Sequence, residues 1–223
     1  MISCEQFCDY YWVNYVALEK DFLQICKYVA LDVDNYETYS SEYLKLLLRI
    51  GSEVDIVLKE YCKILDSSFI GSTICDYREC ILSHEPTYIS QEVMVNEGLI
   101  VLTPWDNRDV EGNFISPFWW SAYNKCKHNR VEEGMIEGQI KDYYKFANLK
   151  YTLNALAGLY QTYIYVYKKI AEFEDERIKV PLPGSRMFKL VGGMWDSVMF
   201  YKDVAFWIDE SGNLFYETGK YPW

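Results

Sequence analysis

The segment that decides the fold runs from Leu149 to Ile170 and reads LKYTLNALAGLYQTYIYVYKKI. Its apolar residues recur at alternating steps of four and three residues, the spacing that places side chains on one face of an α-helix. Small residues among them, Ala155, Ala157 and Gly158, would let a neighbouring helix approach closely. We therefore predict a long buried helix. Its apolar face consists of Leu149, Leu153, Leu156, Tyr160, Tyr163, Tyr167 and Ile170.

Two segments in the first half of the chain show the same spacing, from Tyr11 to Val29 and from Tyr43 to Ile64. Each segment predicts a long helix with one apolar face. A polar connection over residues 32–35 separates them. Either Asp34 or Ser40 could cap the second helix, because both side chains can accept a hydrogen bond from its first turn.

Two shorter helices are predicted in the middle of the chain. One covers about residues 73–84, and Pro86 stops it. The other begins at Ser116–Pro117, an N-cap residue followed by proline at the first helical position. It should run to about Val131, because Gly134 and a further glycine interrupt the helical pattern beyond that residue.

Short extended segments lie between and after the helices. Val93–Val95 and Leu99–Leu102 predict a β-hairpin. In the tail, Val204–Ile208 and Leu214–Tyr216 predict a second hairpin, joined by a turn over Asp209–Asn213.

A chain of 223 residues corresponds to one domain, or to one domain with a small appendage. We expect a mainly α fold with a small β element made from the middle of the chain and the C-terminal tail. Residues 1–175 are expected to form a bundle of about five helices with a hairpin inserted at about residues 90–104. Residues 176–223 are expected to form a β-hairpin extension packed on the same domain.

The net charge and the hydropathy of the chain argue against several classes of function. The chain has 33 acidic and 22 basic residues, a formal net charge of −11, which argues against non-specific binding to DNA or to an anionic membrane. The longest uncharged stretch, between Lys150 and Lys168, is too short and too polar to span a membrane. The first residues lack the basic start and apolar run of a signal peptide. We therefore expect a cytoplasmic protein.

Cysteines and histidines give no indication of a metal site. The seven cysteines include no Cys-x-x-Cys pair, and His84 and His128 are the two histidines of the chain. We expect reduced thiols that pack in the core, and no bound metal. Neither Gly-x-x-x-x-Gly-Lys nor Gly-x-Gly-x-x-Gly occurs, so no nucleotide cofactor is expected.

One segment carries residues suited to chemistry, and it reads WWSAYNKCKHNR from Trp119 to Arg130. Residues 117–130 include three basic side chains and no acidic one, so the segment has a charge of +3 in a protein of −11. Helical spacing places Ser121, Asn124 and His128 on one face. A neighbouring face carries Tyr123, Lys127 and Arg130.

These residue types fit the metal-free cleavage of RNA. The amide of Asn124 could orient the imidazole of His128 by a hydrogen bond, and a neutral imidazole can take a proton from a hydroxyl near pH 7. Flanking cations can neutralise a phosphate as charge builds up on it. The ribose 2′-hydroxyl, which DNA lacks, would supply the attacking oxygen.

The pattern Asn124-x-x-x-His128, late in one helix and followed by a long apolar helix, resembles the motif of the HEPN superfamily. That motif is an arginine, a polar residue that is often asparagine, three variable residues and a histidine. Trp119–Trp120, Lys127-His128-x-Arg130 and Ala147-Asn148-Leu149 also resemble phage-defence HEPN proteins of the abortive-infection type. The resemblance implies a helical bundle that commonly forms homodimers, in which two copies of the motif face each other. Many members are metal-independent ribonucleases, and others are binding modules without activity.

The resemblance also implies roles for single residues. His128 matches the catalytic histidine and Asn124 the polar residue, whereas the arginine of the motif falls at Tyr123. The charge of Arg130 or Lys127 could replace that of the missing arginine. The residues that would bind the phosphate groups of RNA are Lys125, Lys127, Arg130 and Tyr123.

Simpler interpretations stay open. His128 could be a helix-end residue that interacts with the helix dipole, and the cations could form a solvated face. Asn124 and Asn154 could tie helices together, and Trp119–Trp120 could anchor the core. The residues thus support two functional hypotheses. One is a metal-independent endoribonuclease in phage defence or a toxin-type system, and the other is a non-catalytic homodimeric module that binds a protein partner.

Overall fold

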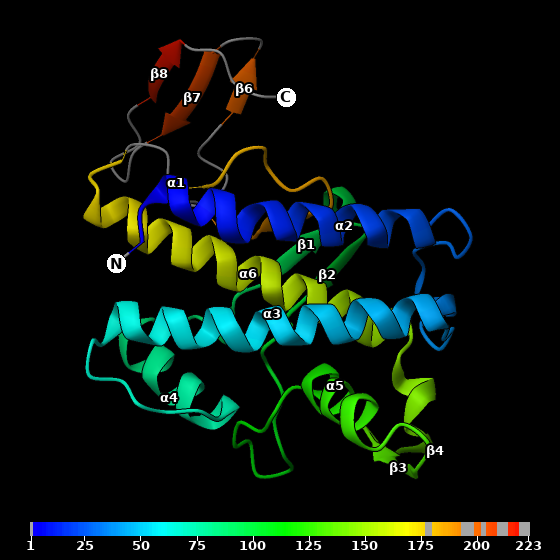
Figure 1. Cartoon of the computed structure of the whole chain (residues 1–223). Coiled ribbons are helices and arrows are strands. Elements are labelled where there is room, and N and C mark those ends of the chain that lie inside the picture. Colours follow the sequence, from blue (N-terminus) through cyan, green and yellow to red (C-terminus); the bar gives the residue numbers. More distant parts are fainter. Residues whose placement is uncertain (1, 177–179, 193–198, 202–203, 209–213, 219–223) are drawn as a thin grey trace.

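The structure, a computed structural model, describes residues 2–176, 180–192, 199–201, 204–208 and 214–218. It is mainly helical with short antiparallel strands, which confirms the expected fold class. Figure 1 shows the helices gathered in a bundle, with α6 running between the N-terminal helices and α3.

Helix α6 (Leu149–Phe173) is the centre of the fold, and most of its residues are buried. It begins at Asn148, whose side chain accepts a hydrogen bond at 3.0 Å from a backbone N–H of the first turn. Helix α6 packs along α3 (Ser41–Leu65). Of the two candidate caps for α3, Ser40 is the one used, because its hydroxyl accepts a hydrogen bond at 3.2 Å from the first turn.

The N-terminal helices form one continuous helical segment. It consists of α1 (Cys4–Phe7), a π-helical turn (Cys8–Trp12) and α2 (Val13–Ile25). The expectation that this helix reaches Val29 is wrong, because after Ile25 the chain tightens into a turn in which Tyr28 N donates to Ile25 O at 2.9 Å. Aromatic rings join this segment to α6. They are Phe7, Tyr11, Trp12 and Tyr15, which contact Tyr160, Tyr163 and Tyr167.

Two shorter helices, α4 (Ile74–His84) and α5 (Phe118–His128), pack on α3. Helix α4 matches the expected bounds closely. Helix α5 is shorter than expected at both ends. Pro117 occupies the cap position and provides no side-chain cap, and the helix ends at His128 because Asn129 leaves the helical backbone.

The segment after α5 forms a hairpin that the sequence analysis does not predict. Strands β3 (Glu133–Ile136) and β4 (Gln139–Asp142) pair antiparallel around Glu137–Gly138. Both turn residues have positive φ, 52° and 75°, as a tight two-residue hairpin turn requires. Gly134 lies within β3, where the side chain of Tyr143 leaves no space for a Cβ.

The middle of the chain and the tail share one sheet. Strands β1 (Val93–Val95) and β2 (Ile100–Leu102) form the hairpin expected there. Strand β5 (Phe188–Leu190) pairs antiparallel with the other edge of β1. The tail is therefore joined to the middle of the chain through β5, as the expected small β element from these two parts requires, whereas the register of β5 on β1 is not indicated by the sequence pattern.

A buried carboxylate also ties the tail to the bundle. Glu19 of α2 is 2 % exposed. It accepts hydrogen bonds from the hydroxyl of Tyr15 at 2.8 Å and from the backbone N–H groups of Arg186 and Met187 at 3.1 Å each. The hydroxyl of Ser185 donates to the same carboxylate. These donors replace the water that a buried charge loses.

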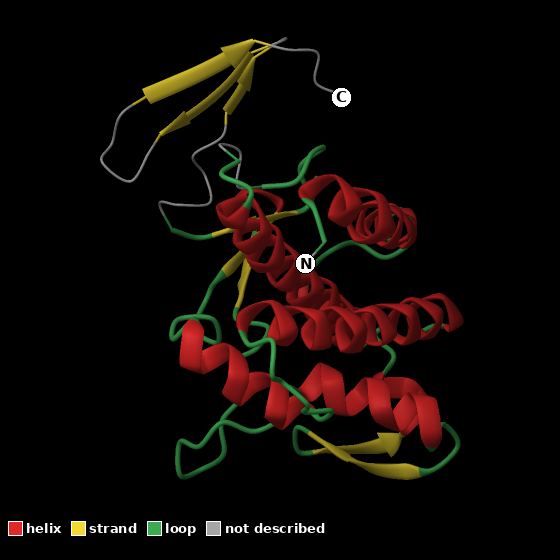
Figure 2. Cartoon of the chain, turned by 60° about the vertical axis from the view of Figure 1, so that its left-hand side comes forward, coloured by secondary structure: helices red, strands yellow, loops and turns green. Residues whose placement is uncertain are grey.

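The remaining strands form a separate antiparallel sheet of β6 (Met199–Tyr201), β7 (Val204–Ile208) and β8 (Leu214–Thr218). The pairing of β7 with β8 is the expected tail hairpin, whose turn over residues 209–213 lies outside the described residues. Strand β6 is an addition to that expectation. Figure 2 shows this sheet at one end of the molecule, beyond the helices.

Candidate functional site

Two tryptophans fix the inner face of α5. Trp119 and Trp120 are 3 % and 8 % exposed, and Nε1 of Trp119 donates to the backbone oxygen of Pro104 at 2.7 Å. Trp119 lies against Gly158 of α6, where an added Cβ would be 3.1 Å from the ring. The interpretation of these tryptophans as core anchors is confirmed by their burial, and the absence of a side chain at Gly158 lets Trp119 approach α6.

Tyr123 packs against α3. Its ring is 3 % exposed and lies on Gly51, where an added Cβ would be 2.3 to 2.5 Å from ring carbons. Its hydroxyl accepts a hydrogen bond from Nζ of Lys127 at 3.2 Å. Tyr123 therefore holds α5 against α3, and the part of it that lines the surface is the hydroxyl edge.

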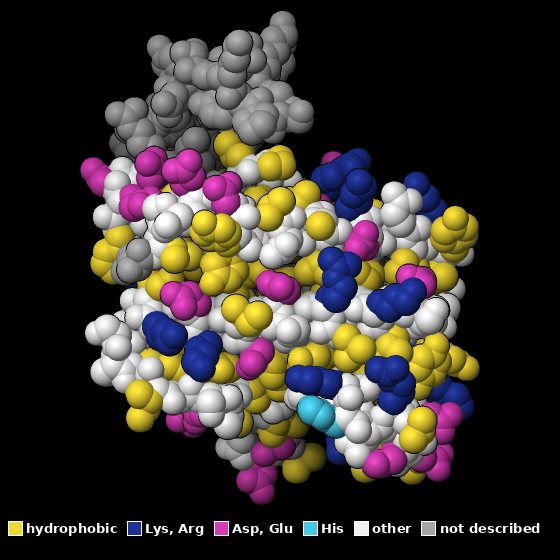
Figure 3. Space-filling view, viewed as in Figure 1, with side chains coloured by type: hydrophobic (Ala, Val, Ile, Leu, Met, Phe, Trp, Pro, Cys, Tyr) yellow, Lys and Arg dark blue, Asp and Glu magenta, His cyan; other side chains and the backbone are white. Residues whose placement is uncertain are grey.

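Three cations lie around the end of α5. Nζ of Lys127 is 5.4 Å from the ring centroid of Tyr123, and Nζ of Lys125 is 5.2 Å from that of Tyr143. Nε of Arg130 donates to a backbone oxygen one turn earlier at 3.3 Å. Among the residues that the structure describes, no carboxylate forms an ion pair with these three cations. Rings and backbone thus position the charges without neutralising them. Figure 3 shows basic side chains over α3 and α5 on the face drawn there.

Asn124 is half-buried and His128 is exposed. In the described part of the chain, neither side chain makes a hydrogen bond. Within the described residues Asn124 donates no hydrogen bond to His128, so the expectation that it orients the imidazole in this way is wrong. His128 is the last residue of that helix, a position that also suits the helix-end interpretation.

A polar groove of about 490 Å³ lies between α5 and the start of α4, with part of α3 as its floor. His128 and Arg130 are not among the residues that line it. The structure thus brings together some of the predicted site residues and leaves these two beyond the groove. The predicted residues that line it are Tyr123, Asn124, Lys125 and Lys127.

The groove also contains residues that the sequence analysis does not predict. They are Asp55 of α3, and Ser72 and Thr73 before α4. Burial raises the pKa of Tyr77 to about 12, and the negative charge of Asp55 is the second cause of this increase. No signal in the sequence marks Asp55, because it is one of several charged residues on the outer face of α3. Its role depends on where α5 packs.

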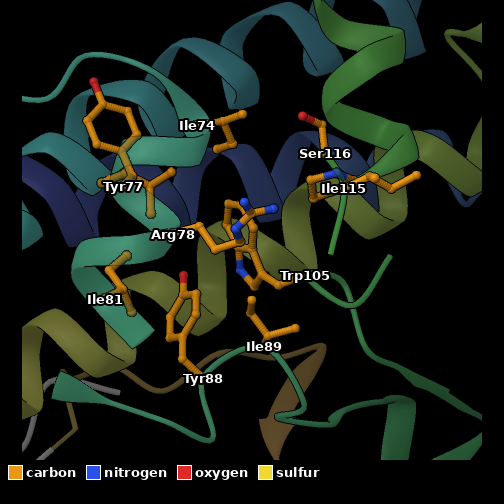
Figure 4. Close-up of a pocket in the computed structure, with 11 residues that line it drawn as sticks. Ile74, Tyr77, Arg78, Ile81, Tyr88, Ile89, Trp105, Ile115 and Ser116 are labelled. Atoms are coloured by element: carbon orange, nitrogen blue, oxygen red, sulfur yellow. The ribbon is translucent and has the colours of Figure 1, made fainter. Parts of the chain in front are cut away.

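A second cavity, on the inner side of α4, is apolar. Figure 4 shows Ile74, Ile81 and Trp105 around it, with Arg78 beside them. The guanidinium of Arg78 donates to the backbone oxygen of Phe114 at 2.8 Å. The cavity volume of about 20 Å³ is room for about one water molecule. This cavity is therefore too small for a substrate.

Comparisons with known proteins add no relative. No family model, no curated protein and no solved structure matches the chain. Within the described residues, no group of three or more His, Cys, Asp and Glu side chains is placed to hold a metal ion. No helix in that part of the chain has the length and apolar character needed to cross a membrane. All seven cysteines are free thiols.

Proposed function

We propose that the protein binds RNA through the polar face of α5 and cleaves it without a metal ion, as the HEPN resemblance implies. The observation that carries the proposal is the set of cations around Lys127, which have no carboxylate partners among the described residues and lie near the exposed His128. In an acidic protein, such a set attracts the phosphate groups of a nucleic acid to one place. The proposal places the protein in the cytoplasm, where thiols stay reduced, in phage defence or a toxin-type system.

His128 would start the reaction as the general base. Its imidazole takes the proton of a ribose 2′-hydroxyl, and the 2′-oxygen attacks the adjacent phosphorus. The bond from phosphorus to the 5′-oxygen breaks, and that oxygen takes a proton from an acid or from water. The products are a 2′,3′-cyclic phosphate and a 5′-hydroxyl. Lys127 and Arg130 neutralise the charge that builds up on the phosphate.

The proposal includes a homodimer. One imidazole cannot both accept the first proton and donate the second at the same moment, so a second imidazolium would help the leaving group. His128 lies at the end of α5, outside the groove of its own chain. A two-fold axis near this helix end would bring a second His128 to the same phosphate.

Incubation of the purified protein with RNA in the presence of a metal chelator tests the cleavage. We expect products that end in cyclic phosphate, and a loss of rate of about 10²-fold or more in His128→Ala, the range that general acid–base catalysis contributes. His84→Ala is the matched control, because it removes the other histidine, which lies at the end of α4. Equal rates in both variants, or no products from the wild type, would refute the cleavage.

The second candidate function is an RNA-binding or protein-binding module without catalysis. The burial of Tyr123 at the position of the family's arginine favours it, because no guanidinium from that position can reach a phosphate. This function predicts that RNA is recovered intact from the same incubation; a module that binds RNA retains the RNA, and a module that binds only protein does not.

A further inference from the structure

We infer that the groove between α4 and α5 receives an unstacked guanine base of the bound RNA, and that Asp55 recognises the base by accepting hydrogen bonds from its Watson–Crick edge. This inference rests on the proposed RNA binding and names the base that the site would select. Proteins that recognise RNA sequence commonly do so through bases turned out of the stack.

The composition of the groove suits one nucleotide. Lys125 and Lys127 line the groove from α5, and Asp55 lines it from α3. Ile74 and Trp120 provide apolar contact, of the kind that the face of any base requires. A volume of about 490 Å³ leaves space for a base and its sugar. The phosphate would lie on the side of the lysines, away from the carboxylate.

The carboxylate of Asp55 decides which base fits. Asp55 is exposed, and no cation in the described residues forms an ion pair with it. An ionised carboxylate accepts hydrogen bonds and donates none. Guanine alone among the four RNA bases presents two adjacent N–H donors on its Watson–Crick edge, from N1 and the exocyclic N2. The other bases place a ring or carbonyl acceptor beside each donor, which a carboxylate repels.

The remaining polar groups complement the rest of that edge. The amide of Asn124 lines the same groove and makes no hydrogen bond within the described part of the free protein. Its N–H can donate to O6 of guanine while Asp55 accepts from N1 and N2. An amine from Lys125 or Lys127 is then left for the phosphate.

Binding of four single-stranded RNA oligonucleotides that differ at one central position, in otherwise uniform uridine, tests the inference. Binding is to be measured by fluorescence anisotropy of the labelled oligonucleotides, with the His128→Ala variant so that no RNA is cleaved. The oligonucleotide with guanine should bind about tenfold more tightly than the others, the discrimination typical of one bidentate contact. Asp55→Asn should abolish this preference and leave the affinity for the other three oligonucleotides equal or higher. Glu60→Gln, which removes a charge from α3 outside the groove, should keep the preference.

Each other outcome decides between the two proposals. If all four oligonucleotides bind equally, or Asp55→Asn strengthens all four by the same factor, the guanine inference is overturned and RNA binding stands. If no oligonucleotide binds, RNA binding is refuted. Binding of guanosine monophosphate and of adenosine monophosphate is measured as well, to distinguish a site for a base in RNA from a site for a free nucleotide. Selective binding of guanosine monophosphate without any RNA binding would support the guanine site for a free nucleotide and refute the RNA proposal.

Discussion

Replacement of Gly51 by alanine tests whether the packing of α5 on α3 is as tight as the structure shows. Gly51 lies in the interior of α3. An added Cβ would lie 2.4 Å from Cγ and 2.3 Å from Cδ2 of Tyr123, whereas carbon atoms in contact are about 3.5–4.0 Å apart. Because Cγ lies on the axis of χ2, turning the ring about that bond leaves the overlap in place. Tyr123 must therefore change its buried χ1 rotamer, or α5 must shift by more than about 1 Å, to restore that contact distance.

Two opposing contributions determine how Gly51→Ala changes the free energy of unfolding: helix propensity and overpacking. In a helix interior, alanine is about 0.8–1.0 kcal/mol more favourable than glycine. Overpacking of a close-packed core costs about 1–3 kcal/mol, and an overlap of this size belongs at the upper end of that range. We therefore expect Gly51→Ala to lower the free energy of unfolding by about 1–2 kcal/mol.

Urea denaturation of a double-mutant cycle measures this balance. In a Tyr123→Ala background, Gly51→Ala should become stabilising by up to about 1 kcal/mol, because the ring is gone and the helix propensity remains. A coupling energy of about 2–3 kcal/mol between the two sites is expected. If Gly51→Ala stabilises the wild-type protein, the ring of Tyr123 does not lie on Gly51 and the described position of α5 is wrong.

Three further substitutions test other parts of the structure. Glu19→Ala should lower the free energy of unfolding by about 3–5 kcal/mol, because several buried donors lose their acceptor. Glu19→Gln should lower it by less. If urea denaturation finds that both variants have the same small effect, Glu19 is not the buried acceptor that the structure shows. Hydrogen bonds from the backbone of Ser72 and Thr73 lower the pKa of Asp76 below its ordinary 3.8, so its contribution to stability is present at neutral pH and is lost as the pH falls through that lowered value. Asp76→Asn should therefore be less stable than the wild type at neutral pH and equal to it in strong acid, and a difference that persists in acid would exclude this cause. Burial raises the pKa of Cys126 to about 11, so iodoacetamide at about pH 8 should label the exposed Cys75 long before Cys126; rapid labelling of both sites, located by mass spectrometry, would refute the burial.

The long helices could be predicted from sequence for a simple physical reason. The apolar residues from Leu149 to Ile170 and from Tyr43 to Ile64 face one common core, so their spacing records the helix period. Capping side chains at Asn148 and Ser40 mark where these helices begin. The sequence does not indicate where a helix ends when no capping side chain is present. At the end of α2, for example, the apolar spacing continues past the last helical residue.

The hairpin of β3 and β4 could not be distinguished from a broken helix. Gly134 stands in a strand because Tyr143 approaches it closely, whereas the turn depends on Glu137–Gly138. In the sequence, Gly134 and Gly138 interrupt a helical pattern in the same way. Only the contact of Tyr143 with Gly134 shows that one glycine belongs to a strand and the other to the turn. The sequence indicates a small β element from the middle and the tail, but the choice of β1 as the partner strand of β5 and the register between them depend on long-range packing.

The candidate site could be predicted in part. The basic segment on α5 is visible in the sequence because its residues are neighbours in the chain. Asp55 and Ser72 lie more than forty residues earlier, and they join Asn124 only because α3, α4 and α5 pack together. The hydrogen bond expected between Asn124 and His128 is not formed, because helical spacing permits such a contact but does not enforce it.

The salt dependence of RNA binding tests most directly the claim that the end of α5 binds phosphate. For single-stranded RNA, the logarithm of the binding constant falls with the logarithm of salt concentration, by about 0.7 for each phosphate neutralised. Replacing both Lys125 and Lys127 by alanine should therefore reduce this slope by about 1.4. Replacing Lys59 and Lys63, two exposed lysines of α3, should leave the slope unchanged. An unchanged slope in the α5 variant, or an equal reduction in both variants, would contradict the account.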